Sequence, residues 1–481
     1  MSGWIEEEFA SLDLGDSRLD RRFRKVLEKM WQSPQSSTAA ASGSWSETVG
    51  AYRFYNNEAV TPEQILAPHR EQVQARCCLA KAVVLIQDTT ELDYSKKKAL
   101  SGTGPLSEKN RQGFFAHNEY VVQEEGGLPL GIWHTDIHAR EPEEHGESQR
   151  RKQLPIQEKE SFRWLEGYRR ACQLQERCPE VQVISTSDRE SDIYELFVEY
   201  QQRREQNQVA ADWIIRSNQD RSLLPPAHDP GPHPQPLKLH ARIEQAPVLG
   251  TITLNVSAKK QLKKIKGSRR LIHRQARQAV LEVRACEVEL KPPFRKGSNL
   301  PPVTVRVVMA KEIDPPADQE PIEWILLTNL PVQNLAEALR VIELYCLRWQ
   351  VEVFHKILKS GCRVEEAQLK FAERLEPRIA LQMVVAWRIH YLTLAGRACP
   401  DLPCGILFAP WEWKAVAVVL RGKGAENIEP TLGEMIRDIG RIGGHLNRKS
   451  DGAPGTQTIW RGMVRMHDFS IMWQACQDPS G

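Results

Sequence analysis

The stretch YCLRWQVEVFHKILKSG, residues 345–361, combines an apolar helical pattern with regularly spaced polar side chains. Because each residue of a helix advances by about 100°, Tyr345, Arg348, Glu352 and Lys359 fall within one sector of roughly 60°. An apolar seam lies beside this polar stripe and consists of Leu344, Leu347, Val351, Phe354 and Leu358. The stripe fits two uses. It could be a solvated face with i,i+4 ion pairs, or a carboxylate that binds a metal ion or a phosphate with the help of neighbouring cations.

Three acidic residues are placed where a carboxylate site could form. Asp88 follows the apolar run Ala82–Ile86, Asp188 follows Val181–Thr186, and Glu352 lies on the expected helix. An acid at the end of a buried strand can leave the core and face a cleft, although it is also typical of a cap or turn. Carboxylate oxygens suit magnesium, and two such ions can stabilise both the attacking and the leaving oxygen of a phosphoryl displacement. Together the three acids predict a metal-dependent phosphoryl-transfer site.

The composition describes a soluble globular protein that is too long for one core. The 481 residues are 41% hydrophobic and 26% charged, so two or three domains are expected. A formal charge of +3 is only mildly basic, so a polyanion would have to be met by local patches. Two runs, Asp20–Lys29 and Lys259–Gln278, are strongly cationic, and each could bind nucleic acid or be a solvated surface.

The distribution of cysteine and of apolar residues indicates a protein of the reducing cytoplasm. The ten cysteines are scattered without a C-x-x-C pair or zinc spacing, which predicts reduced thiols. The first residues are acidic and do not read as a signal peptide. The apolar run IALQMVVAW stops at Arg388, which is too short to cross a bilayer, so no membrane association is expected.

The chain divides into segments that differ in residue composition and in predicted secondary structure. The N-terminal segment is helical, with a loop over Ser33–Ser44 and a capping box at Thr61, and it is either a DNA-reading module or a packing subdomain. An α/β region follows, with a hairpin about Gly126-Gly127 and strands that include Ala211–Ser217. A mainly β insertion is expected from about residue 225 to residue 328, and the segment from about residue 364 onward is expected to be helical at first and then irregular.

These motifs together resemble the insertion-sequence-four family of bacterial DDE transposases. The stretch YCLRWQVEVFHKILK resembles the family's Y-R-E-K signature, and IQDTTELDY and SDRESDI resemble the segments that carry its two aspartates. LGDSRLDRRF and GAYRFYNN resemble its N-terminal DNA-recognition region, PIEWILLTNLPVQNLAEALRVIELY resembles the run into the signature helix, and GRIGGHL resembles a C-terminal motif. The resemblance covers most of the chain but is poor from Ala395 to Asn427, and the basic part of the insertion is longer than the family pattern.

The resemblance implies an α/β fold. Its centre is a ribonuclease-H-like catalytic core with a β-rich insertion, and an N-terminal helical DNA-binding domain and a C-terminal helical domain flank it. The expected limits are 1–70 for the DNA-binding domain, 71–365 for the catalytic domain with the insertion at about 225–325, and 366–481 for the dimerisation domain.

The resemblance also assigns roles to residues. Asp88, Asp188 and Glu352 match the catalytic triad that binds two magnesium or manganese ions. The residues that match DNA-binding positions are Tyr345, Arg348, Lys359 and, as a further candidate, Lys356 for phosphates, Trp324 and Trp349 for a flipped base, and Arg216 for another DNA contact.

The implied function is cut-and-paste DNA transposition. Such an enzyme binds terminal inverted repeats, excises the element through a hairpin intermediate, and joins it to target DNA as a homodimer on double-stranded DNA. A bacterial cytoplasmic, nucleoid-associated location follows. Two alternatives stay open from the sequence: a domesticated DNA-binding regulator that does not cleave, and a ribonuclease-H-fold nuclease without strand transfer.

Overall fold

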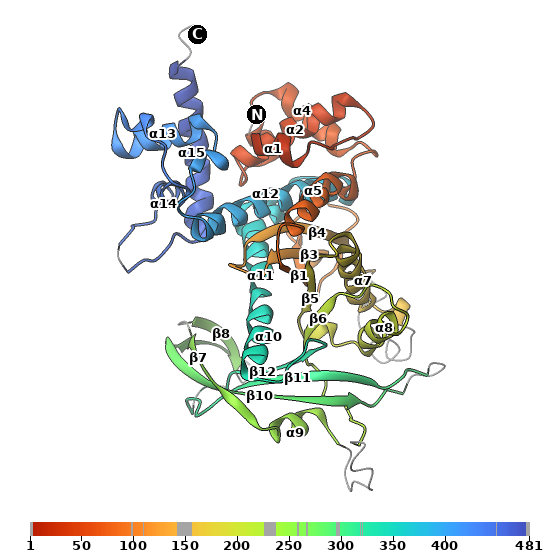
Figure 1. Ribbon diagram of the computed structural model, residues 1–481. Coiled ribbons are helices and arrows are strands. Elements are labelled where there is room, and N and C mark those ends of the chain that lie inside the picture. Colours follow the sequence, from red (N-terminus) through yellow and green to blue (C-terminus); the bar gives the residue numbers. More distant parts are fainter. Residues whose placement is uncertain are drawn as a thin grey trace. The chain divides into compact units, whose positions relative to one another are not determined.

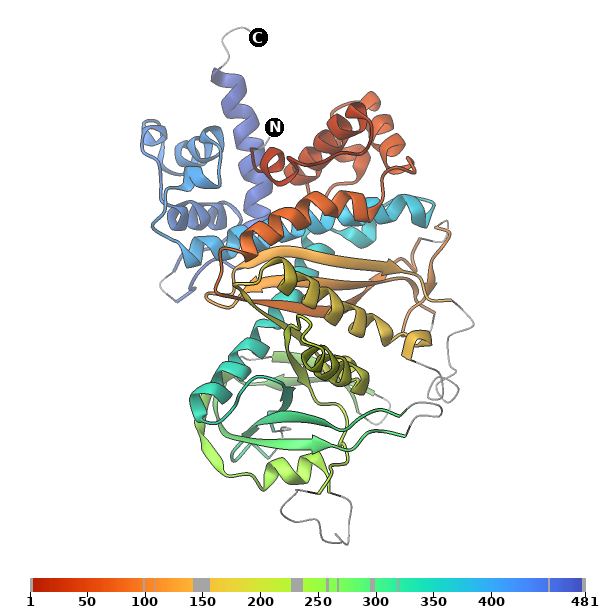
Figure 2. The same cartoon turned by 45° about the vertical axis from the view of Figure 1, so that its right-hand side comes forward.

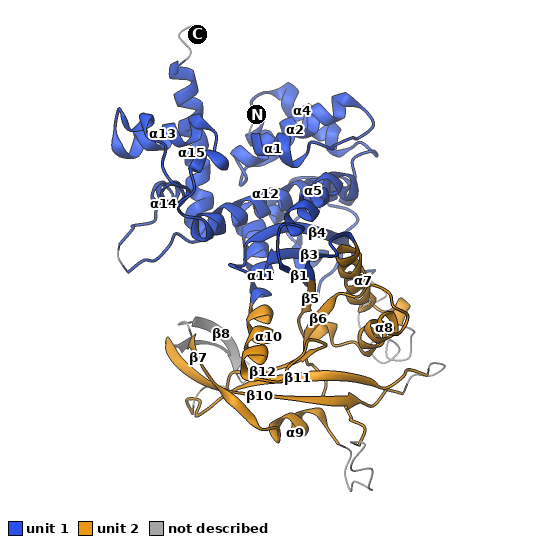
Figure 3. Cartoon of the chain, viewed as in Figure 1, with its two compact units in different colours: residues 1–148, 177–182, 347–481 blue, residues 149–176, 183–346 orange. Residues whose placement is uncertain are grey.

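The polypeptide folds into two units, each built from segments that are distant in the sequence (Figure 3). The computed structural model describes residues 3–477 apart from 98–99, 109, 142–155, 226–236, 257–258, 266–267, 295–298, 318, 320 and 449. The first unit contains residues 1–148, 177–182 and 347–481, and the second contains residues 149–176 and 183–346.

The first unit begins with helices whose ends are set by side-chain caps. They are α1 (Gly3–Glu8), α2 (Ser17–Gln32), α3 (Thr38–Ala41), α4 (Trp45–Tyr55) and α5 (Pro62–Cys77). The Asp16 carboxylate accepts from the backbone of Arg18 and caps α2, and Thr61 and Gln64 form the predicted capping box of α5. The short helix α3 lies inside the segment that was expected to be a loop.

An antiparallel sheet forms the centre of the first unit. Its strands are β1 (Ala82–Asp93), β2 (Gly104–Pro105), β3 (Gln112–Gln123) and β4 (Pro129–His138), and β3 pairs with each of the others. The hairpin predicted about Gly126-Gly127 is confirmed between β3 and β4, and both glycines have positive φ angles, +73° and +64°.

The expectation that β1 ends at Asp88 is wrong. The strand continues to Asp93 because β3 pairs with it along its whole length, from Val83 to Asp93. After Ile86 the continuous apolar run gives way to partly exposed positions and a buried Leu92. Asp88 therefore leaves the core from the middle of a strand, opposite Asn118.

One long helix, α12 (Ala372–Ala398), packs with α5 across β4 (Figures 1 and 2). The indole nitrogen of Trp387 donates to the carbonyl of Pro129 at 3.0 Å, which fixes the helix to the sheet. By length and composition α12 could cross a membrane, and among the described residues it is the one helix that could. However, 83% of its most apolar window is buried inside the fold, as expected for a core helix.

The C-terminal part of the first unit is mainly helical, as the resemblance implies, and the irregular structure expected there is limited to the connections between its helices. Its helices are α13 (Pro410–Arg421), α14 (Leu432–Ile442) and α15 (Thr456–Gln477). GRIGGHL begins inside α14, because Ile439 and Ile442 complete its buried apolar face. The crossing of α14 and α15 is close, since a Cβ added at Gly462 would lie 1.9 Å from the carbonyl oxygen of Ile439.

A buried carboxylate in this region makes stability depend on pH. Burial raises the pKa of Glu412 to about 7 from 4.5. Since the folded-state pKa is the higher one, the group's stabilising contribution is complete below pH 4.5 and is lost as pH rises through 7, by about 3 kcal/mol. We expect Glu412→Gln to flatten the fall in melting temperature between pH 5 and pH 8, as recorded by calorimetry.

A neighbouring histidine also makes stability depend on pH, but in the opposite direction, so the two contributions can be told apart. The Nε2 atom of His467 lies 3.7 Å from a Glu412 oxygen, and burial lowers the pKa of this histidine to about 4. A depressed histidine loses its stabilising contribution as pH falls from 6.5 towards 4, which is the opposite direction. If the melting temperature of Glu412→Gln still falls with pH above pH 6 as steeply as that of the wild type, the assignment to Glu412 is contradicted.

The second unit is built on one mixed sheet. Its strands are β5 (Gln182–Ser187), β6 (Asp212–Arg216), β7 (Val248–Val256), β10 (Arg277–Leu290), β11 (Val303–Glu312) and β12 (Glu323–Thr328), in the order β5-β6-β12-β11-β10-β7. Strands β5 and β6 are parallel and are joined through α8 (Tyr194–Glu205), and the other pairs are antiparallel. Helices α7 (Phe162–Arg177), α9 (Leu239–Glu244) and α10 (Leu335–Leu347) complete the elements. The predicted β insertion is confirmed as a continuation of this sheet.

A separate hairpin carries the strongest cationic run. It consists of β8 (Lys259–Ile265) and β9 (Ser268–Arg274), which pair in an antiparallel register. The register sets Lys259 opposite Arg274 and Lys263 opposite Arg270. The side chains of this run before residue 275 lie outside the described residues.

The expected single helix over residues 345–361 is interrupted. Helix α10 ends at Leu347, α11 (Trp349–Lys356) begins after Arg348, and the π-helix η4 (Ile357–Gly361) follows. The amide of Cys362 donates to the carbonyl of Ile357 at 2.8 Å, which is the bond that widens the last turn. In a π-helix each residue advances by less than the roughly 100° of an α-helix. Lys359 therefore does not lie in the sector of the helix surface that the α-helical pattern predicts.

Candidate active site

Two of the three predicted catalytic acids meet around one guanidinium in the first unit. The Arg348 Nη2 atom donates to Glu352 Oε1 at 2.7 Å, and its Nη1 atom lies 4.0 Å from Asp88 Oδ1. Arg348 comes from the turn between α10 and α11, Glu352 from α11, and Asp88 from the middle of β1. An i,i+4 ion pair of this kind was expected of a solvated helix face, but here the same guanidinium also lies near Asp88 of a distant strand.

His355 belongs to the same cluster and was missed in the sequence. Its Nδ1 atom lies 3.7 Å from Asp88 Oδ2, and its Nε2 atom lies 3.0 Å from the amide nitrogen of Asn118. The amide oxygen of Asn118 accepts from Thr135 at 2.9 Å, so the amide group is oriented by both neighbours. Since Asn118 donates to Nε2, the proton of the neutral ring sits on Nδ1, on the side of Asp88.

The imidazole of His355 stays neutral. Burial first, then the positive charges of Lys359 and Arg348, lower its pKa to about 3. A neutral ring can orient a carboxylate without neutralising it. The sequence signal was weak: His355 follows Glu352 by three residues on the same helix, and Asn118 is identified only by the strand register.

Asp188 lies in the second unit, directly after β5 as predicted. It caps the short 3-10 helix η3 (Arg189–Ser191), and its Oδ1 atom accepts from the amide of Glu190 at 2.9 Å. The other aspartate of the SDRESDI motif, Asp192, is structural. It is buried, and it accepts from Arg221 Nε at 3.0 Å and from the amide of Asn218 at 2.8 Å.

Asp88 and Glu352 in the first unit, and Asp188 in the second, each present a partly buried carboxylate. Carboxylate oxygens are the ligands that hard divalent cations take. No three His, Cys, Asp or Glu side chains gather as a metal cluster within the part of the chain that the structure describes. Arg348 lies next to both acids of the first unit, at the position where their negative charge is concentrated.

The remaining residues of the predicted stripe differ in exposure. Trp349 is 60% exposed and Lys356 is exposed, so both can meet a ligand. Lys359 is half-buried in η4, and burial lowers its pKa while Glu365 and Glu91 oppose that shift. Lys359 is therefore partly buried and has both acidic and basic neighbours.

Three predicted DNA-binding residues lie together in the second unit. The ring centroids of Trp324 and Tyr345 are 6.4 Å apart at 60°, and Tyr345 is only 6% exposed. Arg216 donates from Nη2 to the carbonyl of Glu323 at 3.1 Å, next to Trp324 in β12. Arg216 of β6 thus bonds to the backbone next to Trp324, and Trp324 of β12 lies beside Tyr345 of α10.

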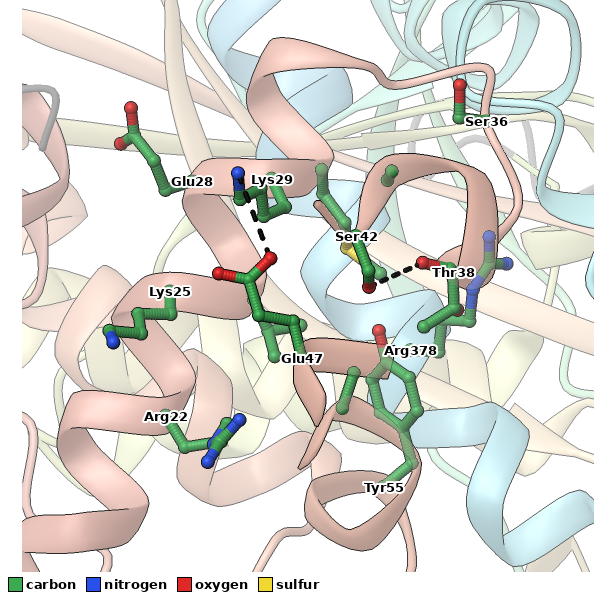
Figure 4. Close-up of a pocket in the computed structure, with 14 residues that line it drawn as sticks. Arg22, Lys25, Glu28, Lys29, Ser36, Thr38, Ser42, Glu47, Tyr55 and Arg378 are labelled. Carbon is green, nitrogen blue, oxygen red and sulfur yellow. Dashed lines mark hydrogen bonds and ion pairs between the residues drawn. The ribbon is translucent and has the colours of Figure 1, made fainter. Parts of the chain in front are cut away.

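The N-terminal helices hold a pocket of about 190 Å³ with a cationic rim (Figure 4). Arg22, Lys25 and Lys29 line it from α2, and Lys29 lies 4.0 Å from Glu47 of α4. Helix α4 lacks a side chain at Gly50, where an added Cβ would lie 1.8 Å from Arg22 Nη1. The glycine of GAYRF thus lets the guanidinium rest against α4.

Comparison with protein families finds three transposase descriptions in chain order. "Transposase DNA-binding" matches residues 1–60, "Transposase DDE domain" matches residues 161–387, and "Transposase Tn5 dimerisation domain" matches residues 384–473. Asp188 and Glu352 fall inside the DDE match, and Asp88 precedes it. The lining of the cationic pocket falls inside the DNA-binding match apart from Arg378, and the α14–α15 crossing falls inside the dimerisation match.

These matches confirm the family resemblance of the sequence motifs, the α/β fold with its helical flanking regions, and the enzyme class. They are consistent with the insertion-sequence-four family. The chain belongs to the DDE transposases of the Tn5 type, metal-dependent enzymes that cleave DNA and transfer its strands.

Proposed function

We propose that the protein excises a transposable element from double-stranded DNA through a hairpin intermediate and joins it to target DNA, with Asp88, Asp188 and Glu352 as the ligands of two magnesium or manganese ions. The observation that supports this proposal most directly is that the Arg348 guanidinium lies between Asp88 and Glu352. Two acids from distant segments meet beside one cation, and converging carboxylates can hold the metal ions that phosphoryl transfer uses.

Different residues of the chain have different roles in the proposed reaction. Asp88, Asp188 and Glu352 would hold the ions, which when bound would supply positive charge for activating a water molecule and stabilising the leaving oxygen. Arg348 holds Glu352 in place and can turn towards a DNA phosphate, and His355 with Asn118 orients the Asp88 carboxylate. Lys356 is exposed and offers a further cation for the backbone.

We assign the proposed partners to regions of the chain. Residues 1–70 bind the inverted repeats of the element, residues 71–365 carry catalysis, and residues 366–481 pair two subunits on two DNA ends. The cationic rim of the pocket in Figure 4 supports the first assignment. Action on chromosomal DNA places the enzyme on the bacterial nucleoid.

The direct test uses DNA that flanks the gene of this protein. We expect purified protein with magnesium to nick the element end and then to release it as a hairpin, seen on denaturing gels as one strand of twice the length of either strand of the released end. Nicked product that never becomes a hairpin and never joins target DNA would identify a nuclease without strand transfer. Binding without any cut would contradict the proposed function.

Trp324 provides a sharper test of the hairpin step. A tight strand reversal is relieved when one base leaves the stack for an aromatic site, and stacking is worth roughly 1–3 kcal/mol per base. We expect Trp324→Ala to slow hairpin formation about 5- to 150-fold while the first nick stays near the wild-type rate. Trp411→Ala in α13 is the matched control. An equal loss at both steps would indicate a folding defect.

Phosphate contacts should appear in the salt dependence of end binding. Each lost contact reduces the slope of log affinity against log salt by about 0.9 on duplex DNA. We therefore expect Arg348→Ala and Lys359→Ala each to lower the slope by about one contact, and Lys423→Ala, an exposed surface lysine, to leave it unchanged. Unchanged slopes in both test variants would mean that neither cation touches the DNA backbone.

A further inference from the structure

Two cysteines that are far apart in the sequence meet in the first unit. Cys78 is the C-terminal cap of α5, Cys178 follows α7, and their sulfur atoms are 2.8 Å apart. A disulfide bond is about 2.05 Å long, so the two sulfurs need to approach by less than 1 Å to join. The two cysteines are 100 positions apart in the sequence, so their spacing gave no sign of this contact.

Backbone hydrogen bonds hold the two segments against each other. The carbonyl of Gln74 accepts from the amide of Cys78 at 3.0 Å and from the Cys178 thiol at 3.8 Å. The amide of Gln182 donates to the carbonyl of Lys81 at 3.0 Å, three residues beyond Cys78. The contact of the sulfurs thus belongs to the fold and does not depend on side-chain rotation alone.

The two thiols have different surroundings. Cys78 is exposed, so a small oxidant can reach its sulfur, whereas Cys178 is 1% exposed and lies behind it. Cys77 is next to Cys78 in the sequence but points into the core, where burial raises its pKa. An accessible thiol with a sheltered partner is the arrangement in which a first oxidation product is captured by a second sulfur.

We propose that Cys78 and Cys178 are a redox modification site that forms an intramolecular disulfide when the protein meets a peroxide. In the first step the Cys78 sulfur attacks one peroxide oxygen, the O–O bond breaks, and the thiol proton leaves with the other oxygen as water. In the second step the Cys178 sulfur attacks the sulfenic acid of Cys78, the S–O bond breaks, and the second proton leaves with the hydroxyl as water. Two thiols are oxidised, and one peroxide is reduced to two waters.

The disulfide would connect parts of the chain that bear on catalysis. The two cysteines are separated by 100 positions, and the closed loop contains β1 with Asp88. Cys178 stands shortly before β5 and Asp188 in the sequence. Disulfides in reducing compartments are typically transient and redox-sensing, which fits a link that forms on exposure to oxidant and is removed by thiols.

The test uses the full-length, reduced protein. It is treated with hydrogen peroxide, blocked with N-ethylmaleimide, digested with trypsin without reductant, and mapped by mass spectrometry. We expect a cross-link between the peptides 77–81 and 178–189, the loss of two titratable thiols per chain, and full reversal by dithiothreitol. We also expect the oxidised protein to melt at a higher temperature than the reduced protein, because the link restricts the unfolded chain.

Variants separate Cys78 from its neighbour, since one tryptic peptide contains both Cys77 and Cys78. Cys78→Ser and Cys178→Ser should each abolish the cross-link, whereas Cys77→Ser and Cys399→Ser, the latter a distant exposed cysteine, should retain it. A cross-link that survives in Cys78→Ser, a cross-link between two chains, or both thiols found alkylated after peroxide treatment would overturn the proposal. All of these readouts are independent of DNA cleavage.

Discussion

Asp88→Ala, Asp188→Ala and Glu352→Ala are each expected to abolish strand cleavage while end-DNA binding is retained. Removing one strong electrostatic group from an active site typically costs 10²–10³-fold in rate, and loss of a metal ligand should cost at least about that much. The measurement is single-turnover cleavage of a labelled element end with magnesium, next to a gel-shift titration of the same DNA without metal.

A matched control for this series lies on the same strand. Glu91 is three residues after Asp88 in β1, and it accepts from the amide of Ser107 at 2.9 Å on the other face. Glu91→Gln keeps this acceptor and should cleave at close to the wild-type rate. Wild-type cleavage in any of the three alanine variants would remove that residue from the site.

Gly462→Ala is expected to disrupt the dimerisation region. A Cβ at this position would lie 1.9 Å from the carbonyl oxygen of Ile439 and 2.8 Å from its carbon, so α14 and α15 would have to separate. Both partners are helical backbone and cannot turn aside. We expect a loss of stability of about 3 kcal/mol or more, at the upper end of overpacking effects. Gly443→Ala should act in the same way, because its Cβ would meet the carbonyl oxygen of Thr458 at 1.8 Å.

The readout combines stability with assembly. Calorimetry should record the fall in melting temperature, and light scattering with end DNA should record the loss of complexes that hold two ends. Gly455→Ala is the matched control, since no atom lies within 4 Å of the added Cβ. Normal paired-end complexes in Gly462→Ala would mean that the α14–α15 crossing is not needed for pairing two subunits.

Local sequence patterns predicted the elements whose formation depends on residues close together in the chain. The capping box at Thr61, the hairpin about Gly126-Gly127, and the strand before Asp188 all depend on neighbours within a few residues, and all three are confirmed. A C-terminal helical domain was expected, but Gly and Pro near residues 440–455 suggested an irregular end, whereas only the connection between α14 and α15 is irregular. The apolar face of α14 and its contact with α15 decide that region instead.

By itself the sequence determined the family, since the motifs around Asp88, Asp188 and Glu352 identify a DDE transposase, as the family matches confirm. Only the tertiary structure decided how the site is held. The register of β1 and β3 keeps Asp88 in mid-strand opposite Asn118, and the turn at Arg348 brings its guanidinium to two acids. His355, and likewise the meeting of Cys78 with Cys178, could not be predicted because such contacts depend on strand register and on helix packing between segments far apart in the chain.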